Sequence, residues 1–111
     1  MTTRVIALDL DGTLLTSKKT ILPASLEALA RAREAGYQVI VVTGRHHVAI
    51  HPFYQALALD TPAICCNGTY LYDYHAKEVL TADPMPVAQA VSLTAMLAEQ
   101  QIHGLAYVDD A

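Results

Sequence analysis

Hydrophobic positions in the first part of the chain form two short continuous runs separated by a stretch of helical spacing. The runs cover residues 4–9 and 37–43, and each is typical of a strand that is buried on both faces of a parallel sheet. Between them, apolar side chains recur three and four residues apart from Pro23 until Gly36, which predicts an amphipathic helix. Residues 4–43 therefore predict a β-α-β unit.

The rest of the chain continues with strand and helix patterns. The predicted elements are a helix over residues 47–59, a third strand over 62–66, a β-hairpin over 69–81, a helix over 87–98 and a last strand over 102–108. Pro52 is expected to restrict the first of these helices to its C-terminal part, because proline has no amide hydrogen. The helix over 87–98 has an apolar stripe that predicts packing in a core or a cap. The last strand needs a neighbour, which indicates that the sequence is the front part of a longer chain.

This order of elements predicts an α/β fold with a Rossmann-like sheet in which the first three strands run parallel. Ligands of such sheets bind in the crevice beyond the carboxyl ends of the strands. We therefore expect Asp9, Thr43 and Asn67, which each follow or end a predicted strand, to lie along one edge of the sheet.

Composition excludes several classes of protein. With 53% hydrophobic and 16% charged residues, the 111-residue chain can build a core, which disordered sequences cannot. A net charge of −4 without a basic run predicts no nucleic-acid partner, and no apolar run approaches the roughly 18 residues of a membrane span. The N-terminal sequence has no secretory signal, which favours the cytoplasm. Cys65 and Cys66 are adjacent, which predicts reduced, structural thiols.

The sequence Asp-Leu-Asp-Gly-Thr-Leu at residues 9–14 ends the first predicted strand with two carboxylates. Residues two apart in a strand project to one side, so Asp9 and Asp11 converge beyond its end. Two like charges there invite a divalent cation or a division of acid and base roles. Gly12 lets the backbone approach a ligand, and neighbouring amides such as that of Leu10 can cradle an oxyanion. An Asx-turn explains a lone Asp-Gly, but two carboxylates on a buried side need a partner.

A second candidate loop, Thr43-Gly44-Arg45, ends the neighbouring predicted strand. Its hydroxyl and amides can face the same crevice as Asp9, which makes it a candidate phosphate-binding loop. Taken alone, the tripeptide is better explained as a capped strand-to-helix turn.

Three histidines follow this loop. His47 and His51 have the i, i+4 spacing of zinc ligands, and His46 precedes them. Pro52 weakens the helix that would align them, so we expect exposed histidines at the start of the helix and leave their role open.

The strings DLDGTLL, VVTGR and CCNGTYLYD, at residues 9–15, 41–45 and 65–73, resemble motifs of the haloacid dehalogenase superfamily of aspartyl-phosphate phosphatases. The third string is similar to that of the Cof-type branch, which carries a large α/β cap. The resemblance implies that residues 1–82 form the N-terminal part of the phosphatase core and residues 83–111 begin the cap. It also implies Mg²⁺-dependent hydrolysis of a small phosphorylated metabolite, with pyridoxal phosphate as the leading candidate.

The resemblance further implies residue roles. Asp9 matches the nucleophile that becomes the aspartyl phosphate, and Asp11 matches the acid/base. Mg²⁺ would be held by Asp9 and by the backbone carbonyl of Asp11. The residues expected to bind the phosphate or the substrate are Leu10, Gly12, Thr43, Gly44, Arg45 and Asn67.

Two elements of the family have no match after Thr43: the lysine that offsets the phosphoryl charge and the acidic loop that completes the magnesium site. We therefore expect the 111-residue chain by itself to be inactive. Two alternatives stay open: a truncated, non-catalytic fragment that retains the phosphate cradle, and a receiver-like signalling domain. A receiver needs a phosphoacceptor aspartate where Cys65 and Cys66 stand. The oligomeric state is not predicted.

Overall fold

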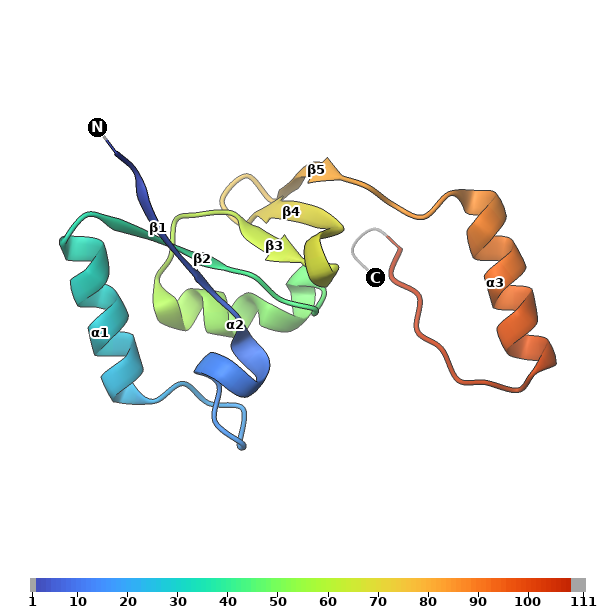
Figure 1. Ribbon diagram of the computed structural model, residues 1–111, viewed down its shortest axis with the longest axis horizontal. Coiled ribbons are helices and arrows are strands. Elements are labelled where there is room, and N and C mark those ends of the chain that lie inside the picture. Colours follow the sequence, from blue (N-terminus) through green and yellow to red (C-terminus); the bar gives the residue numbers. More distant parts are fainter. Residues whose placement is uncertain (1, 109–111) are drawn as a thin grey trace.

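The computed structural model describes residues 2–108 and shows an α/β arrangement (Figure 1). Its elements in chain order are β1 (Arg4–Leu8), η1 (Leu10–Leu14), α1 (Pro23–Glu34), β2 (Tyr37–Val41), α2 (His47–Leu57), β3 (Ala63–Cys65), η2 (Cys66–Gly68), β4 (Tyr70–Asp73), β5 (Glu78–Ala82) and α3 (Val87–Glu99). The three helices, the first three strands and the hairpin predicted from the sequence are confirmed, with small shifts at their ends.

The strands form a parallel pair and an antiparallel three-stranded sheet. β1 and β2 pair in parallel, from Arg4 opposite Tyr37 to Leu8 opposite Val41. A single parallel bridge between Val42 and Ile64 joins the end of β2 to β3, which confirms the predicted direction of the third strand. β3, β4 and β5 then continue as an antiparallel meander. The carboxyl ends of β1, β2 and β3 therefore open at one edge.

The core lies between these strands and the helices beside them, with α1 packed against β2 and α2. Its largest fully buried side chains come from η1, β2, α2 and β3: Leu10, Val39, Val41, Ile50 and Cys65. Because η1 contributes a buried leucine, the turn that carries the candidate carboxylates is anchored in the core.

α2 begins at His47 and contains Pro52, so the prediction that Pro52 restricts this helix to its C-terminal part is wrong. Proline removes one hydrogen bond of the ladder. The first turn of α2 is stabilised by a hydrogen bond from outside the helix. The His46 side chain caps this turn by accepting a hydrogen bond from the amide of Val48. Burial of Ile50 adds further support.

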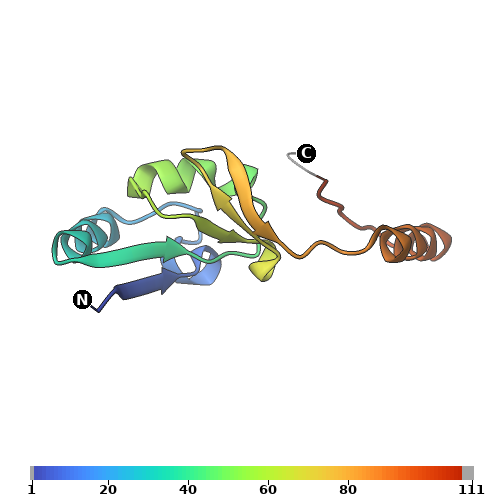
Figure 2. The same ribbon diagram turned by 90° about the horizontal axis from the view of Figure 1, so that it is seen from above.

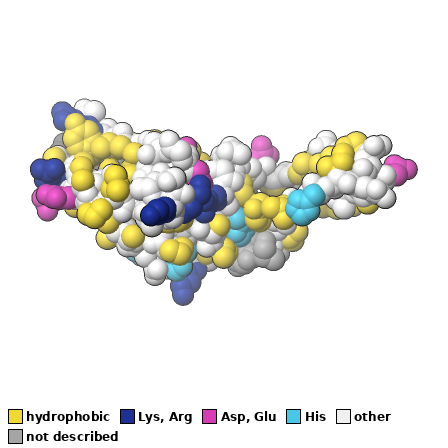
Figure 3. All heavy atoms as spheres, turned by 90° about the horizontal axis from the view of Figure 1, so that it is seen from below, with side chains coloured by type: hydrophobic (Ala, Val, Ile, Leu, Met, Phe, Trp, Pro, Cys, Tyr) yellow, Lys and Arg dark blue, Asp and Glu magenta, His cyan; other side chains and the backbone are white. Residues whose placement is uncertain are grey.

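α3 stands apart from the sheet, beyond the segment 83–86 (Figures 1 and 2). Most of its hydrophobic side chains are exposed, as in Figure 3, with Val87 and Val91 at 79% and 64% exposure. Within residues 2–108 no side chain of α3 is buried. The apolar stripe predicted for this helix therefore does not pack against the core formed by these residues. None of the described helices is long and apolar enough to span a membrane.

The strand predicted over residues 102–108 is wrong, because this segment forms no ladder in the structure. A strand needs a partner for its backbone groups, and the described part of the chain pairs none with it. Residues 109–111 lie outside the described residues.

Candidate active site

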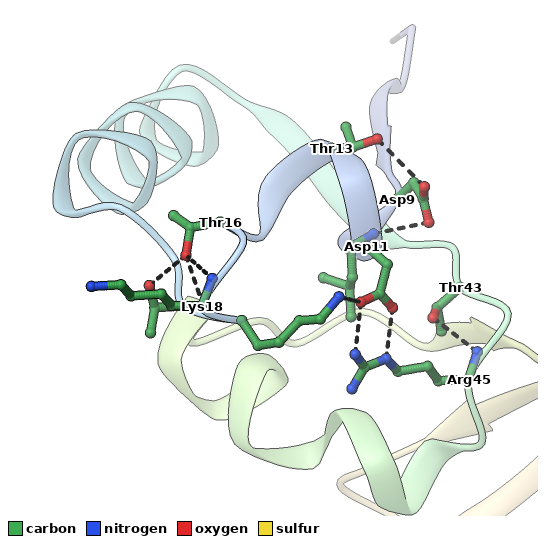
Figure 4. A network of polar contacts seen from close by, with 10 residues as sticks. Asp9, Asp11, Thr13, Thr16, Lys18, Thr43 and Arg45 are labelled. Carbon is green, nitrogen blue, oxygen red and sulfur yellow. Dashed lines mark hydrogen bonds and ion pairs between the residues drawn. The ribbon is translucent and has the colours of Figure 1, made fainter.

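The turn after β1 carries both candidate carboxylates (Figure 4). Asp9 caps this turn, because its Oδ1 accepts the amide of Leu10 at 3.0 Å and its Oδ2 accepts the hydroxyl of Thr13 at 3.4 Å. The chain bends at Asp11 and Gly12, and Gly12 has a left-handed φ of 78° that favours glycine. A Cβ at Gly12 would meet nothing within 4 Å, so the space above the turn is open.

Asp11 is held by two cations (Figure 4). Arg45 donates to both carboxylate oxygens, from Nε to Oδ2 at 2.6 Å and from a terminal nitrogen to Oδ1 at 2.7 Å. Lys19, from the small hairpin closed by the bridge between Leu15 and Ile21, donates to Oδ1 at 2.8 Å. These hydrogen bonds, with that of Arg45 the larger effect, hold the pKa of Asp11 well below its usual range.

The loop after β2 brings a hydroxyl to the same edge of the sheet. Thr43 is 3% exposed, and its amide donates to the carbonyl of Ile64 at 2.9 Å. Its hydroxyl oxygen accepts the amide of Arg45 at 3.0 Å. Since an oxygen that accepts keeps its own hydrogen, the Thr43 hydroxyl can still donate to a phosphoryl oxygen.

Gly44 and Asn67 lie in close contact across this edge. A Cβ at Gly44 would stand 2.9 Å from the Oδ1 of Asn67. Asn67 has a left-handed φ of 57°, and its amide donates to the carbonyl of Thr43 at 3.0 Å. The space beside Asn67 therefore requires glycine at position 44.

The structure thus brings together the turn after β1 and the loop after β2, through the pair of Arg45 and Asp11. Asn67, from η2, lies against the same loop. Leu10 is placed differently, because its side chain is fully buried and its amide is engaged by Asp9. The sequence patterns did not predict the ion pairs of Asp11, since Lys19 and Arg45 come from two other loops.

The oxygen atoms of this turn suit magnesium, which takes oxygen ligands and usually binds one or two carboxylates beside substrate phosphate and water. Both hydrogen bonds to the Asp9 carboxylate come from neutral donors of its own turn, and no ion pair among residues 2–108 involves it. The Asp11 carboxylate is taken by cations, which leaves its backbone carbonyl as the suitable group. Within the same residues no cluster of three or more His, Cys, Asp and Glu side chains could hold a metal.

The prediction of exposed histidines is wrong for His46 and His47, which are each 4% exposed. His47 stacks on Tyr72, with ring centroids 3.7 Å apart, and His46 stacks on Tyr107 at 5.0 Å. His51 is exposed, as predicted. The alternation of tyrosines at positions 70, 72 and 74 is the signal that could have indicated an aromatic cluster.

Comparison with known proteins matches residues 6–111 to the family of haloacid dehalogenase-like hydrolases. A relative from Escherichia coli (strain K12), the pyridoxal phosphate phosphatase YbhA, is 84% identical over the whole chain, which covers 41% of that protein. An HMP-PP phosphatase from Serratia proteamaculans is 34% identical over 90% of the chain, which covers 33% of the relative. The chain therefore spans about two fifths or less of the length of these relatives.

Solved structures have the same fold. A haloacid dehalogenase-like hydrolase from Bacteroides thetaiotaomicron superposes with a TM-score of 0.78 at 27% identity, over 90% of this chain and 39% of that one. Another, from B. subtilis, superposes with a TM-score of 0.78 at 29% identity, over 89% of this chain and 34% of that one.

Proposed function

Because the chain belongs to the family of haloacid dehalogenase-like hydrolases, we propose that the protein hydrolyses small phosphomonoesters with Asp9 as the nucleophile. The observation that carries this proposal is the meeting of two loops at one sheet edge, which puts the Asp9 turn beside the loop of Thr43 and Arg45. Carboxylates, a hydroxyl and a guanidinium at one edge of a sheet are groups that suit phosphoryl transfer by a covalent route.

The proposed reaction has two steps. In the first, a carboxylate oxygen of Asp9 forms a bond to phosphorus and the bond from phosphorus to the leaving oxygen breaks. Asp11, which must first leave its ion pairs with Arg45 and Lys19 and take up a proton, gives that proton to the leaving oxygen. In the second, Asp11 takes a proton from water as the water oxygen attacks phosphorus. The bond from phosphorus to Asp9 then breaks, which releases phosphate and restores both carboxyl groups.

The other side chains of the edge hold the phosphoryl group. Thr43 donates its hydroxyl hydrogen to a phosphoryl oxygen, and Gly44 lets the backbone come close. Arg45, which holds both carboxylate oxygens of Asp11 in this structure, would turn its guanidinium to the phosphate when Asp11 is released. A magnesium ion held by Asp9 and the carbonyl of Asp11 would neutralise the negative charge of the phosphate that Asp9 approaches.

Pyridoxal phosphate is the proposed substrate, supported by the printed activity of the E. coli relative. The break at 83–86 and the separate position of α3 support a cap that begins in residues 83–111. The polypeptide of residues 1–111 alone should be inactive, since it lacks the lysine and acidic loop of the family pattern.

The test is hydrolysis by the purified protein at its natural length. Release of inorganic phosphate from pyridoxal phosphate and from a panel of sugar and nucleoside monophosphates is measured with Mg²⁺ and with EDTA. The proposal expects turnover with Mg²⁺ and its loss in EDTA. Phosphate binding without turnover would favour a non-catalytic phosphate-binding protein, and activity undiminished by EDTA would contradict the role of the metal.

A further inference from the structure

The loop of residues 43–47 is held along its whole length by the segment that follows β3. The carbonyls of Thr43 and Arg45 accept the amides of Asn67 and Cys66, each at 3.0 Å. The last residue of the loop, His47, is held by a side chain, since its amide donates to the hydroxyl oxygen of Tyr70 at 2.9 Å. Every second residue of the loop is therefore fastened to residues 66–70.

Tyr70 also contacts the side chain of His47 in two ways. The same hydroxyl forms a hydrogen bond of 2.8 Å with Nδ1 of the His47 ring, and the ring of Tyr70 meets the imidazole edge-on at 5.7 Å. On the other side, the hydroxyl of Tyr74 donates to the carbonyl of His47. One residue is thus fixed at its amide, its ring and its carbonyl by the hairpin of β4 and β5.

His47 is the first residue of α2, and Arg45 stands two residues before it. An amide in the first turn of a helix has no partner in its own helix. Because Tyr70 supplies that partner, its hydroxyl fixes where the helix begins and hence where the loop ends. Together with the backbone bonds from Cys66 and Asn67, a side chain in β4 therefore fixes the C-terminal end of the loop that carries Thr43 and Arg45.

The geometry points to Tyr70 as a positioning residue for the phosphate-binding loop, acting through His47. This inference rests on the proposed function for its catalytic consequence. Tyr70 itself touches no reacting group in this arrangement. Burial raises the pKa of Tyr70, so the hydroxyl keeps its hydrogen at neutral pH.

The chain offers a matched control at the other end of the same helix. The hydroxyl of Tyr54, in α2, donates to the carbonyl of Thr61 at 2.8 Å. Tyr54→Phe and Tyr70→Phe each remove one hydroxyl that binds a backbone group of another segment. Only Tyr70 lies beside the loop, so only Tyr70→Phe should change phosphate binding.

The experiment uses the protein at its natural length with Mg²⁺. Binding of inorganic phosphate is titrated calorimetrically, KM and kcat are measured with pyridoxal phosphate, and melting temperatures are recorded. For Tyr70→Phe, which loses two hydrogen bonds to His47, we expect the Kd for phosphate and the KM to rise about 3- to 10-fold, the net worth of about one of those bonds, with kcat changed less. For Tyr54→Phe, which loses one hydrogen bond, we expect a smaller fall in melting temperature and unchanged phosphate binding.

An unchanged phosphate Kd in Tyr70→Phe, or an equal rise in both variants, would overturn the positioning role. If Tyr70→Phe does not fold, Tyr74→Phe is measured in its place, because it removes the hydroxyl that donates to the carbonyl of His47. The same changes in phosphate Kd and KM are then expected, and the same results would overturn the role of the hairpin in positioning the loop. Phosphate binding with the expected difference but without turnover would refute the proposed function and leave the positioning role standing. A wild-type protein that binds no phosphate would refute both.

Discussion

Replacing Gly44 with alanine tests how closely the two loops of the site fit. The added Cβ would lie 2.9 Å from the Oδ1 of Asn67, where ordinary contact begins at 3.4 Å, so one group must move by about 0.5 Å. Gly44 is not among the glycines with a positive φ, so alanine fits the backbone and the contact is the main penalty. Asn67 has a short side chain, and its backbone amide donates to the carbonyl of Thr43. The side-chain oxygen therefore cannot easily move away from position 44.

The expected effect has two parts. Overpacking of this kind destabilises a protein by about 1–3 kcal/mol. Since a misplacement of about 1 Å can reduce catalysis roughly 100-fold, a movement of half that size should lower kcat/KM about 10-fold. Gly104→Ala is the matched control, because its Cβ would also lie 2.9 Å from its neighbour, the flexible end of Leu97, away from the site.

A double-mutant cycle with Asn67→Gly isolates the contact. Glycine accepts the left-handed φ at position 67 and removes the obstructing amide. In urea unfolding, Gly44→Ala should lower the free energy of unfolding when Asn67 is present. It should lower it hardly at all in a protein that also carries Asn67→Gly. Wild-type activity and stability of Gly44→Ala, or a penalty that persists beside Asn67→Gly, would refute this account of the loop.

Three further outcomes follow from the site. Asp11→Asn should lower kcat about 10²- to 10⁴-fold through loss of proton transfer, measured by phosphate release. Because Arg45 and Lys19 lower the pKa of Asp11 from its ordinary 3.8, their pairing stabilises the fold above that pH and is lost below it. Urea midpoints should therefore fall as the pH drops below about 4, and less steeply in Lys19→Met than in Lys18→Met. Burial raises the pKa of Cys65 to about 11, so iodoacetamide near neutral pH should label the partly exposed Cys66 first, as peptide mass spectrometry would show.

The sequence predicted those parts of the fold that depend on local pattern. Continuous apolar runs located β1 and β2, and their parallel pairing explains why the Asp9 turn and the Thr43 loop share an edge. The strand expected over 102–108 failed because apolar alternation describes a strand only when another strand is beside it. Pro52 was misjudged because capping and burial held a helix that local propensity disfavours.

Contacts between residues far apart in the sequence could not be predicted from the pattern of apolar and polar positions. Arg45 and Asp11 are 34 positions apart, and no spacing rule indicates that the guanidinium turns toward the carboxylate. Burial of His46 and His47 depends on tyrosines of a later hairpin. The prediction of exposed histidines, made because Pro52 weakens the helix, was therefore wrong for His46 and His47.

The central claim is that Asp9 attacks phosphorus, and turnover by Asp9→Asn tests it most directly. An amide cannot form the aspartyl phosphate, while the turn can keep its shape because the asparagine oxygen still accepts the amide of Leu10. At natural length and with saturating Mg²⁺, the account predicts a folded Asp9→Asn protein that binds phosphate and releases none from pyridoxal phosphate. Full activity of that variant would contradict it.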